Sequence, residues 1–109
     1  MRKVSVLGTE YTLIEDNDTN NQRLAAAGDG YCDTSIKECV VDEMIATTPT
    51  AKADLQSYKK SVIRHELIHA FLYESGLDAC SWAKEEEMVD WLAIQSPKLM
   101  QVFVEVGAL

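Results

Sequence analysis

The sequence predicts a single small α+β domain, in which an N-terminal antiparallel sheet of about three or four strands packs on helices. The N-terminal part holds short apolar runs separated by segments rich in Gly, Asn and Asp, which is typical of strands and turns. The C-terminal half repeats its apolar residues at intervals of three and four, which is typical of helices. A chain of 109 residues supports one core, so we expect one domain over residues 1–109.

A hairpin is expected at the start of the chain. Residues 4–7 and 11–14 read as strands, and Gly8-Thr9-Glu10 between them is a three-residue link that suits a hairpin turn. Residues 16–21, rich in Asn, Asp and Thr, read as the loop that follows this hairpin.

A short helix and two more strands are expected next. The helix covers residues 22–27, because Gly28 is a typical helix stop. The strands lie over residues 31–34 and 36–44, and polar, Thr-rich residues around Pro49 then lead into a long helix.

The long helix should begin at residue 50 or 52 and end at Ser75, before the stop signal Gly76. Its apolar stripe includes both histidines of the chain, so these side chains do not point to bulk water. The stripe consists of Leu55, Tyr58, Val62, His65, His69 and Leu72.

Two further helices are expected after Gly76. The first starts at residue 81 or 82 and runs to Gln95, with Trp82, Val89 and Ala93 packed on the long helix. Ser96-Pro97 then reads as an N-cap with proline at the first position of a C-terminal helix. The buried stripe of that helix would be Leu99, Val102, Phe103 and Val106, although the alternation of Val102, Val104 and Val106 also suits a strand.

The long helix carries the zinc-peptidase motif H-E-x-x-H as His65-Glu66-Leu67-Ile68-His69. Residues four apart on a helix lie on the same face, so both imidazoles can reach one metal ion. Glu66 can approach a water molecule on that ion without ligating it. The alternative is a pair of histidines with purely structural roles, but the pattern favours a Zn²⁺ site.

The third zinc ligand is expected in the acidic run that begins at Glu85. Glu86 and Asp90 are four apart and share a helical face with Val89, so Glu86 is the predicted ligand, with Glu85 and Glu87 as alternatives. Asp90 would accept a hydrogen bond from the non-ligating nitrogen of a zinc histidine, and His65 is the expected donor. A solvated acidic first turn, favoured by the helix dipole, would produce a similar run.

H-E-x-x-H followed by Glu86-x-x-x-Asp90 resembles the gluzincin metallopeptidases, and residues 62–93 resemble the small minigluzincins and similar phage or prophage proteins. The resemblance implies a minimal zincin-like fold in which His65, His69 and Glu86 bind zinc. It also implies that Glu66 is the general base and that Asp90 supports a ligand histidine. Larger gluzincins stabilise the tetrahedral intermediate with a histidine or tyrosine from a further domain, and this chain has neither that domain nor a third histidine.

We therefore expect a zinc-dependent endopeptidase that hydrolyses a protein or peptide, with Glu66 as general base. The substrate should add antiparallel to an exposed strand over residues 36–42. Tyr31, Tyr58, Tyr73 and Arg64 are the candidate oxyanion helpers, although each also fits a structural role.

Two alternatives have different consequences for activity. One is a zinc-stabilised regulatory module without catalysis, in which the same ligands only hold the helices together. The other is a latent form, in which the C-terminal segment covers the site and Glu105 or the carboxylate of Leu109 approaches the metal.

The cysteines and the net charge bear on the redox state, the binding partners and the location of the protein. Cys32, Cys39 and Cys80 lack metal-type spacing and read as free thiols, although Cys32 and Cys39 could face each other and Cys80 could cap the metal. The net charge of -8 disfavours nucleic acid and anionic membrane surfaces. Without an apolar span or signal peptide, the expected location is the cytoplasm, or the host cytoplasm for a phage-encoded protein.

Overall fold

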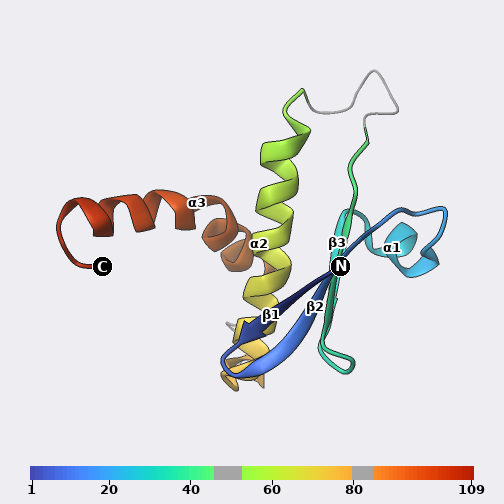
Figure 1. The fold of residues 1–109 in the computed structure, drawn as a ribbon, viewed down its shortest axis with the longest axis horizontal. Helices are drawn as coiled ribbons and strands as arrows, with labels where there is room; N and C mark the ends of the chain where they lie inside the picture. Colours follow the sequence, from blue (N-terminus) through green and yellow to red (C-terminus); the bar gives the residue numbers. More distant parts are fainter. Residues whose placement is uncertain (46–52, 80–84) are drawn as a thin grey trace.

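The computed structural model describes residues 1–45, 53–79 and 85–109 of the chain. These residues form a four-stranded sheet near the N-terminus and helices that pack against it, which confirms the predicted α+β class (Figure 1). The elements are β1 (Arg2–Val6), β2 (Thr9–Asp16), α1 (Gln22–Ala27), β3 (Gly30–Asp33), β4 (Glu38–Asp42), α2 (Leu55–Glu74), the 3₁₀ turn η1 (Leu77–Ala79) and α3 (Glu86–Glu105).

The strands lie in the order β1-β2-β4-β3. β1 pairs with β2, and β3 with β4, in antiparallel fashion, whereas β2 and β4 are parallel. The sheet is therefore mixed and not purely antiparallel as expected. The difference arises because the chain crosses over through α1 and β3 before it enters β4, so that β4 fills the interior position and β3 becomes an edge strand.

The first hairpin turn is shorter than the sequence suggests. Val6 pairs with Thr9, so the link consists of Leu7 and Gly8, and not of Gly8-Thr9-Glu10. Leu7 has φ 50° and Gly8 has φ 89°, as a two-residue hairpin turn with left-handed central residues requires. Glycine meets this requirement at little cost, whereas the exposed Leu7 adopts a conformation that is uncommon for its type.

Helix α1 has the predicted bounds because its ends are capped as the sequence indicates. The side chain of Asn21 accepts a hydrogen bond from the Leu24 backbone N–H at 3.0 Å. Gly28 closes the other end with φ 104° and donates its N–H to the Leu24 carbonyl. Leu24 is fully buried and anchors the helix against the rest of the fold.

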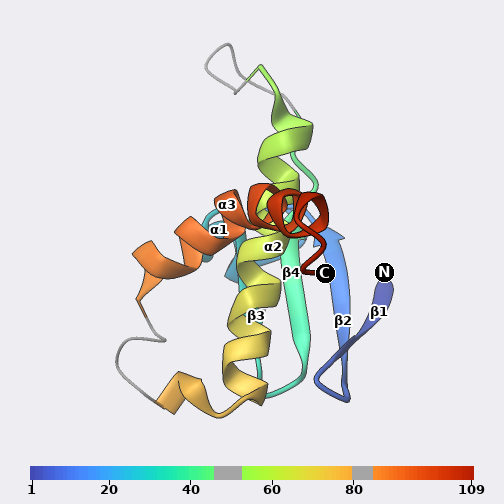
Figure 2. The ribbon, with the colours of Figure 1, turned by 90° about the vertical axis from the view of Figure 1, so that its left-hand side faces the viewer.

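The main core lies between the sheet and α2, which crosses one face of the sheet (Figure 2). Asp54 caps α2 by accepting from the Ser57 N–H at 3.1 Å, and the helix ends at Glu74, next to the predicted Ser75. The helix begins at Leu55, later than the predicted residue 50 or 52, because Ala53 and Asp54 are not helical. Residues 50 and 52 themselves lie outside the described residues. The core cluster consists of Val6, Tyr11, Leu13, Cys39, Val41, Val62 and Ala70.

The two helices expected after Gly76 are a single helix, α3, which continues through Pro97. In Figure 1 this helix bends midway, and its C-terminal half extends away from the sheet. Proline has no backbone N–H, so a proline inside a helix removes one helical hydrogen bond. Here the carbonyl of Ala93, four residues before Pro97, accepts a hydrogen bond from Arg64 Nε instead. Arg64 belongs to α2, far from Pro97 in the sequence. The local Ser96-Pro97 pattern therefore predicts a new helix, whereas the structure continues α3 through the proline.

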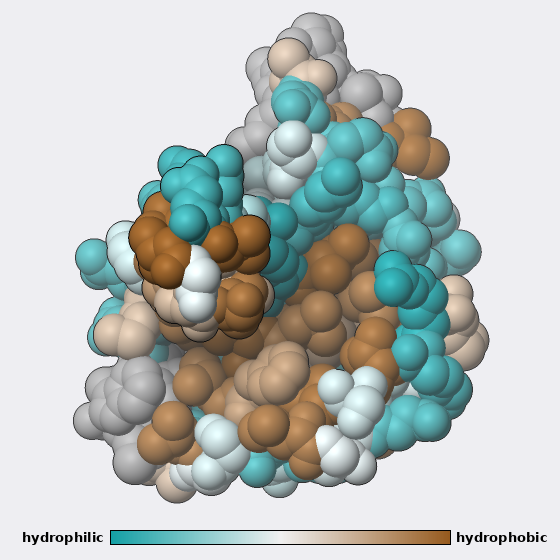
Figure 3. Space-filling view, turned by 60° about the vertical axis from the view of Figure 1, so that its left-hand side comes forward, coloured by the Kyte–Doolittle hydropathy of each residue, from teal (hydrophilic) through white to brown (hydrophobic). Residues whose placement is uncertain are grey.

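The C-terminal half of α3 is largely exposed, although Ser96 and Leu99 are half-buried. Val89 and Ala93 are buried as predicted, and Trp82 lies outside the described residues. Val102, Phe103 and Val106, expected in a buried stripe, are 51%, 41% and 71% exposed, so this prediction is wrong, as is the strand alternative. Figure 3 shows apolar side chains on the projecting half of α3 and in the hollow beside it. None of the described helices is both long enough and apolar enough to cross a membrane.

Glu74, at the end of α2, joins the helix to β2 and to the turn between β3 and β4. Its carboxylate accepts hydrogen bonds from Thr9 Oγ1 at 2.9 Å and Tyr11 Oη at 2.7 Å, and it pairs with Lys37 Nζ at 3.0 Å. The bond from Tyr11 and that from Lys37 lower the pKa of Glu74. The ionised carboxylate therefore stabilises the fold.

Glu74→Gln should lower the melting temperature at pH 7 and have a smaller effect at pH 3. A carboxyl whose pKa is lowered on folding stabilises above its unfolded pKa of about 4.3, and this contribution is lost as the pH falls through the folded value. Thermal unfolding at the two pH values measures the difference. Glu10→Gln, which removes only the exposed pair with Lys3, is the control and should change little. Equal losses at both pH values would show that the charge of Glu74 is not what stabilises the fold.

Candidate metal centre

Helix α2 brings His65, Glu66 and His69 together. The Nε2 atoms of the two histidines are 3.2 Å apart, and the ligand atoms of all three residues lie within 4.8 Å of one another, so the group could hold a metal ion. A tetrahedral ion with bonds of 2.0 to 2.1 Å would hold two ligand atoms roughly 3.3 Å apart. The spacing of the two nitrogens therefore fits a shared metal ion.

Helix α3 adds Glu86 to this group. Glu86 Oε1 is 2.8 Å from His69 Nε2, and Oε2 is 2.9 Å from His65 Nε2. The carboxylate thus faces the same point as both imidazoles. The alternatives Glu85 and Glu87 do not share this position, since neither is among the described residues that line the cavity around the histidines. The first turn of α3 therefore presents one carboxylate to the histidines and leaves its neighbours outside.

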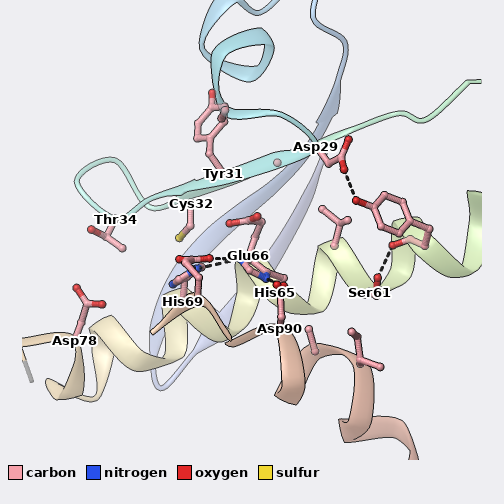
Figure 4. Close-up of a pocket in the computed structure, with 17 residues that line it drawn as sticks. Asp29, Tyr31, Cys32, Thr34, Ser61, His65, Glu66, His69, Asp78 and Asp90 are labelled. Carbon is pink, nitrogen blue, oxygen red and sulfur yellow. Dashed lines mark hydrogen bonds and ion pairs between the residues drawn. The ribbon is translucent and has the colours of Figure 1, made fainter. Parts of the chain in front are cut away.

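Asp90 lies where the sequence places it, one turn beyond Glu86. Its Oδ1 is 2.6 Å from His65 Nδ1, the nitrogen that does not face His69 (Figure 4). A carboxylate at this nitrogen favours a proton on Nδ1 and leaves the Nε2 lone pair free for a metal ion. This contact favours the tautomer of His65 that a ligand needs.

The histidine cluster borders a cavity of about 680 Å³ between α2, α3 and the edge strand β3. Cavities of this size are typical of ligand sites. Figure 4 shows His65 and His69 on α2 and Asp90 on α3, with β3 across the cavity. The cavity also contains Asp29, Thr34 and Asp78, which nothing in the sequence marked as site residues.

Burial changes the acid–base properties of the cluster. The side chain of Glu66 is 6% exposed, and burial raises its pKa to about 7. Burial also lowers the pKa of His69, which favours the neutral imidazole that binds metals. A bound dication would lower the pKa of Glu66 again, because it favours the ionised carboxylate.

β3, and not β4, is the edge strand beside the cavity. The predicted docking strand over residues 36–42 largely coincides with β4, which is paired on both sides, so that prediction is wrong. Among the described strands, β3 lies at an edge of the sheet, and it borders the cavity. Sequence reasoning could not choose between them, because the strand order depends on the crossover.

Gly30 in β3 allows the strand to pass close to Glu66. A Cβ atom on Gly30 would lie 3.2 Å from Glu66 Oε2 and 3.0 Å from the Val40 carbonyl oxygen. A side chain here would therefore displace either the carboxylate or the strand. Gly30 was not among the predicted site residues, although a glycine in a strand is a recognised signal of close approach.

Cys32 and Cys39 face each other across β3 and β4. They are register partners, their sulfur atoms are 3.5 Å apart, and both are free thiols, as predicted. The hydrogen bond to Cys32, together with burial, raises the pKa of the Cys39 thiol. Cys80, considered as a cap for the metal, lies outside the described residues.

The four candidate oxyanion helpers are engaged elsewhere. The Tyr31 hydroxyl accepts from Asn21 Nδ2 at 3.0 Å and points away from the histidines in Figure 4. The Tyr58 hydroxyl donates to the Asp29 carboxylate, which raises the pKa of Tyr58 to about 12. The Tyr73 ring lies 4.7 Å from Lys37 Nζ, and Arg64 binds the Ala93 carbonyl. These contacts favour the structural interpretation of each residue.

Comparisons with known proteins give no relative: no family model matches the chain, and no curated protein or solved structure shows significant similarity to it.

Proposed function

We propose that this chain is a zinc-dependent endopeptidase of the cytoplasm, with a site formed by His65, His69 and Glu86 and with Glu66 as general base. The observation that carries the proposal is the convergence of the Glu86 carboxylate and both Nε2 atoms on one point, beside the buried carboxylate of Glu66. Two imidazoles and one carboxylate are a donor set that suits zinc in catalytic sites.

The residues divide the chemistry among them. Bound zinc would supply Lewis acidity towards the peptide carbonyl and make water easier to deprotonate. The carboxylate of Glu66 would accept a proton from water and transfer it to the leaving amine. Asp90 would keep the Nδ1 proton of His65 in place. Gly30 leaves the space in which the carboxylate of Glu66 lies.

A peptide substrate would lie along the free edge of β3. Backbone hydrogen bonds to an edge strand are a recurring mode of binding for extended segments, and β3 borders the same cavity as Glu66. This arrangement would place a peptide bond near the cluster without requiring a specific side chain.

One observation favours a second candidate, a zinc-binding regulatory module without catalysis. The Tyr58 hydroxyl, which lines the cavity, already donates to Asp29, and the Tyr31 side chain points away from the histidines, so neither is placed to stabilise an oxyanion (Figure 4). A latent form has less support, because the C-terminal half of α3 extends away from the sheet (Figure 1) and neither Glu105 nor Leu109 lines the cavity.

Metal analysis combined with a peptide-library digestion tests the proposed function. The purified protein should hold about one zinc per chain, and it should cleave library peptides in a reaction that a chelator stops and added zinc restores. Zinc binding without cleavage would favour the regulatory module. Cleavage that a chelator leaves unchanged would contradict the proposed chemistry.

A further inference from the structure

Arg64 makes a contact that the chemistry above does not use. It precedes His65 on α2, and its Nε donates to the Ala93 carbonyl on α3. In an uninterrupted helix, that carbonyl would accept the N–H of residue 97, which Pro97 lacks. Ala93 is 1% exposed, so its carbonyl would otherwise be a costly unpaired group. Arg64 thus replaces the missing bond with one that joins two helices.

From this geometry we infer that Arg64 is a positioning residue, which holds α3 so that Glu86 and Asp90 reach the histidines of α2; the inference rests on the proposed zinc site. Arg64 and His65 are neighbours on α2, while Asp90 and Ala93 lie one turn apart on α3. The bonds Arg64–Ala93 and His65–Asp90 therefore attach α3 to α2 at two adjacent points.

The apolar contribution to this attachment is small. Within α3 only Val89 and Ala93 are buried, and beyond Pro97 every residue except the half-buried Leu99 is exposed. Glu86 and Asp90, whose side chains are 64% and 62% exposed, contact the histidines but are covered little by the rest of the fold. Their position thus depends strongly on the backbone of α3, which Arg64 binds directly. Loss of that bond should move both carboxylates relative to the histidines.

A matched pair of variants separates the hydrogen bond of Arg64 from its charge. In Arg64→Gln the side-chain amide nitrogen is as many bonds from the backbone as Nε of Arg64. A hydrogen-bond donor therefore remains while the charge is lost. In Arg64→Met the side chain has a similar length but no donor. Lys60→Met, which removes an exposed cation from the same helix, is the control for charge alone.

Two measurements test the role. Hydrogen exchange of the α3 backbone in the metal-free protein reports the attachment, and competition with a zinc-binding dye reports the affinity for zinc. Arg64→Met should expose α3 to faster exchange and weaken zinc binding by about tenfold, as loss of a supporting partner does. Arg64→Gln and Lys60→Met should remain within about threefold of wild type in affinity, well below that effect.

The outcomes are distinct. A wild type that binds zinc, together with an Arg64→Met variant of equal affinity, overturns the positioning role and leaves the proposed function intact. The same holds if Arg64→Gln loses as much affinity as Arg64→Met, because the charge and not the donor would then matter. A wild type that binds no zinc overturns the proposed function, and the positioning role with it, whatever the exchange rates show.

Discussion

Glu66→Gln should abolish peptide cleavage and leave zinc bound. Loss of a general base costs about 10²- to 10⁴-fold in rate, because the amide cannot accept a proton from water. The substitution keeps the shape of the side chain, which matters because Glu66 is 6% exposed and lies against Gly30. A larger change would disturb β3 as well as the chemistry. The zinc content should stay near wild type because Glu66 is not a proposed ligand.

The measurement is the rate of cleavage of a peptide selected from the library, with zinc content determined on the same samples. Glu87→Gln is the matched control, since it makes the same exchange at an exposed position beside the site. It should cleave at the wild-type rate. If Glu66→Gln cleaves as fast as wild type, Glu66 is not the base. If wild type and variant are both inactive but bind zinc, the regulatory module is the better account.

The parts of the site that follow from local spacing could be predicted from the sequence. Two histidines four apart on a helix must share a face, and α2 brings their Nε2 atoms to 3.2 Å. The same periodicity predicts that Glu86 and Asp90 lie on one face of α3, and the structure places both against His65. The capping signals around α1 are equally local, and its bounds are as predicted.

The parts that depend on distant contacts could not be predicted. Pro97 reads as the start of a new helix, but its missing bond is compensated by Arg64. β4 reads as an exposed strand, but the crossover places it between β2 and β3. The same crossover sets Gly30 against Glu66. In each case the structure depends on a contact with residues far away in the sequence, so no short stretch of sequence is sufficient to predict it.

Substitutions around the cluster should affect zinc binding in a graded way. His69→Ala and Glu86→Ala each remove a proposed ligand and should largely abolish binding. Asp90→Asn removes the charge that faces His65 Nδ1 but leaves all ligands, so the affinity should fall by about 10- to 100-fold. Glu85→Ala is the control and should bind as wild type does, because Glu85 does not line the cavity. Titration against a zinc-binding dye would measure all four.

The stabilisation by zinc should differ among these variants in the same order as their zinc affinity, because the proposed ligands come from two helices. A ligand that binds only the folded state stabilises it by RT ln(1 + [L]/Kd), about 2.7 kcal/mol at a hundredfold excess over Kd. Chelation should therefore lower the melting temperature of wild type and of Glu85→Ala, lower that of Asp90→Asn less, and leave Glu86→Ala unchanged. Full zinc retention by Glu86→Ala would move the third ligand to Glu85, Glu87 or Cys80. An ion that bridges α2 and α3 is lost when unfolding separates the two helices, so its binding must raise the melting temperature. If zinc binds without raising the melting temperature, the ion does not join α2 to α3.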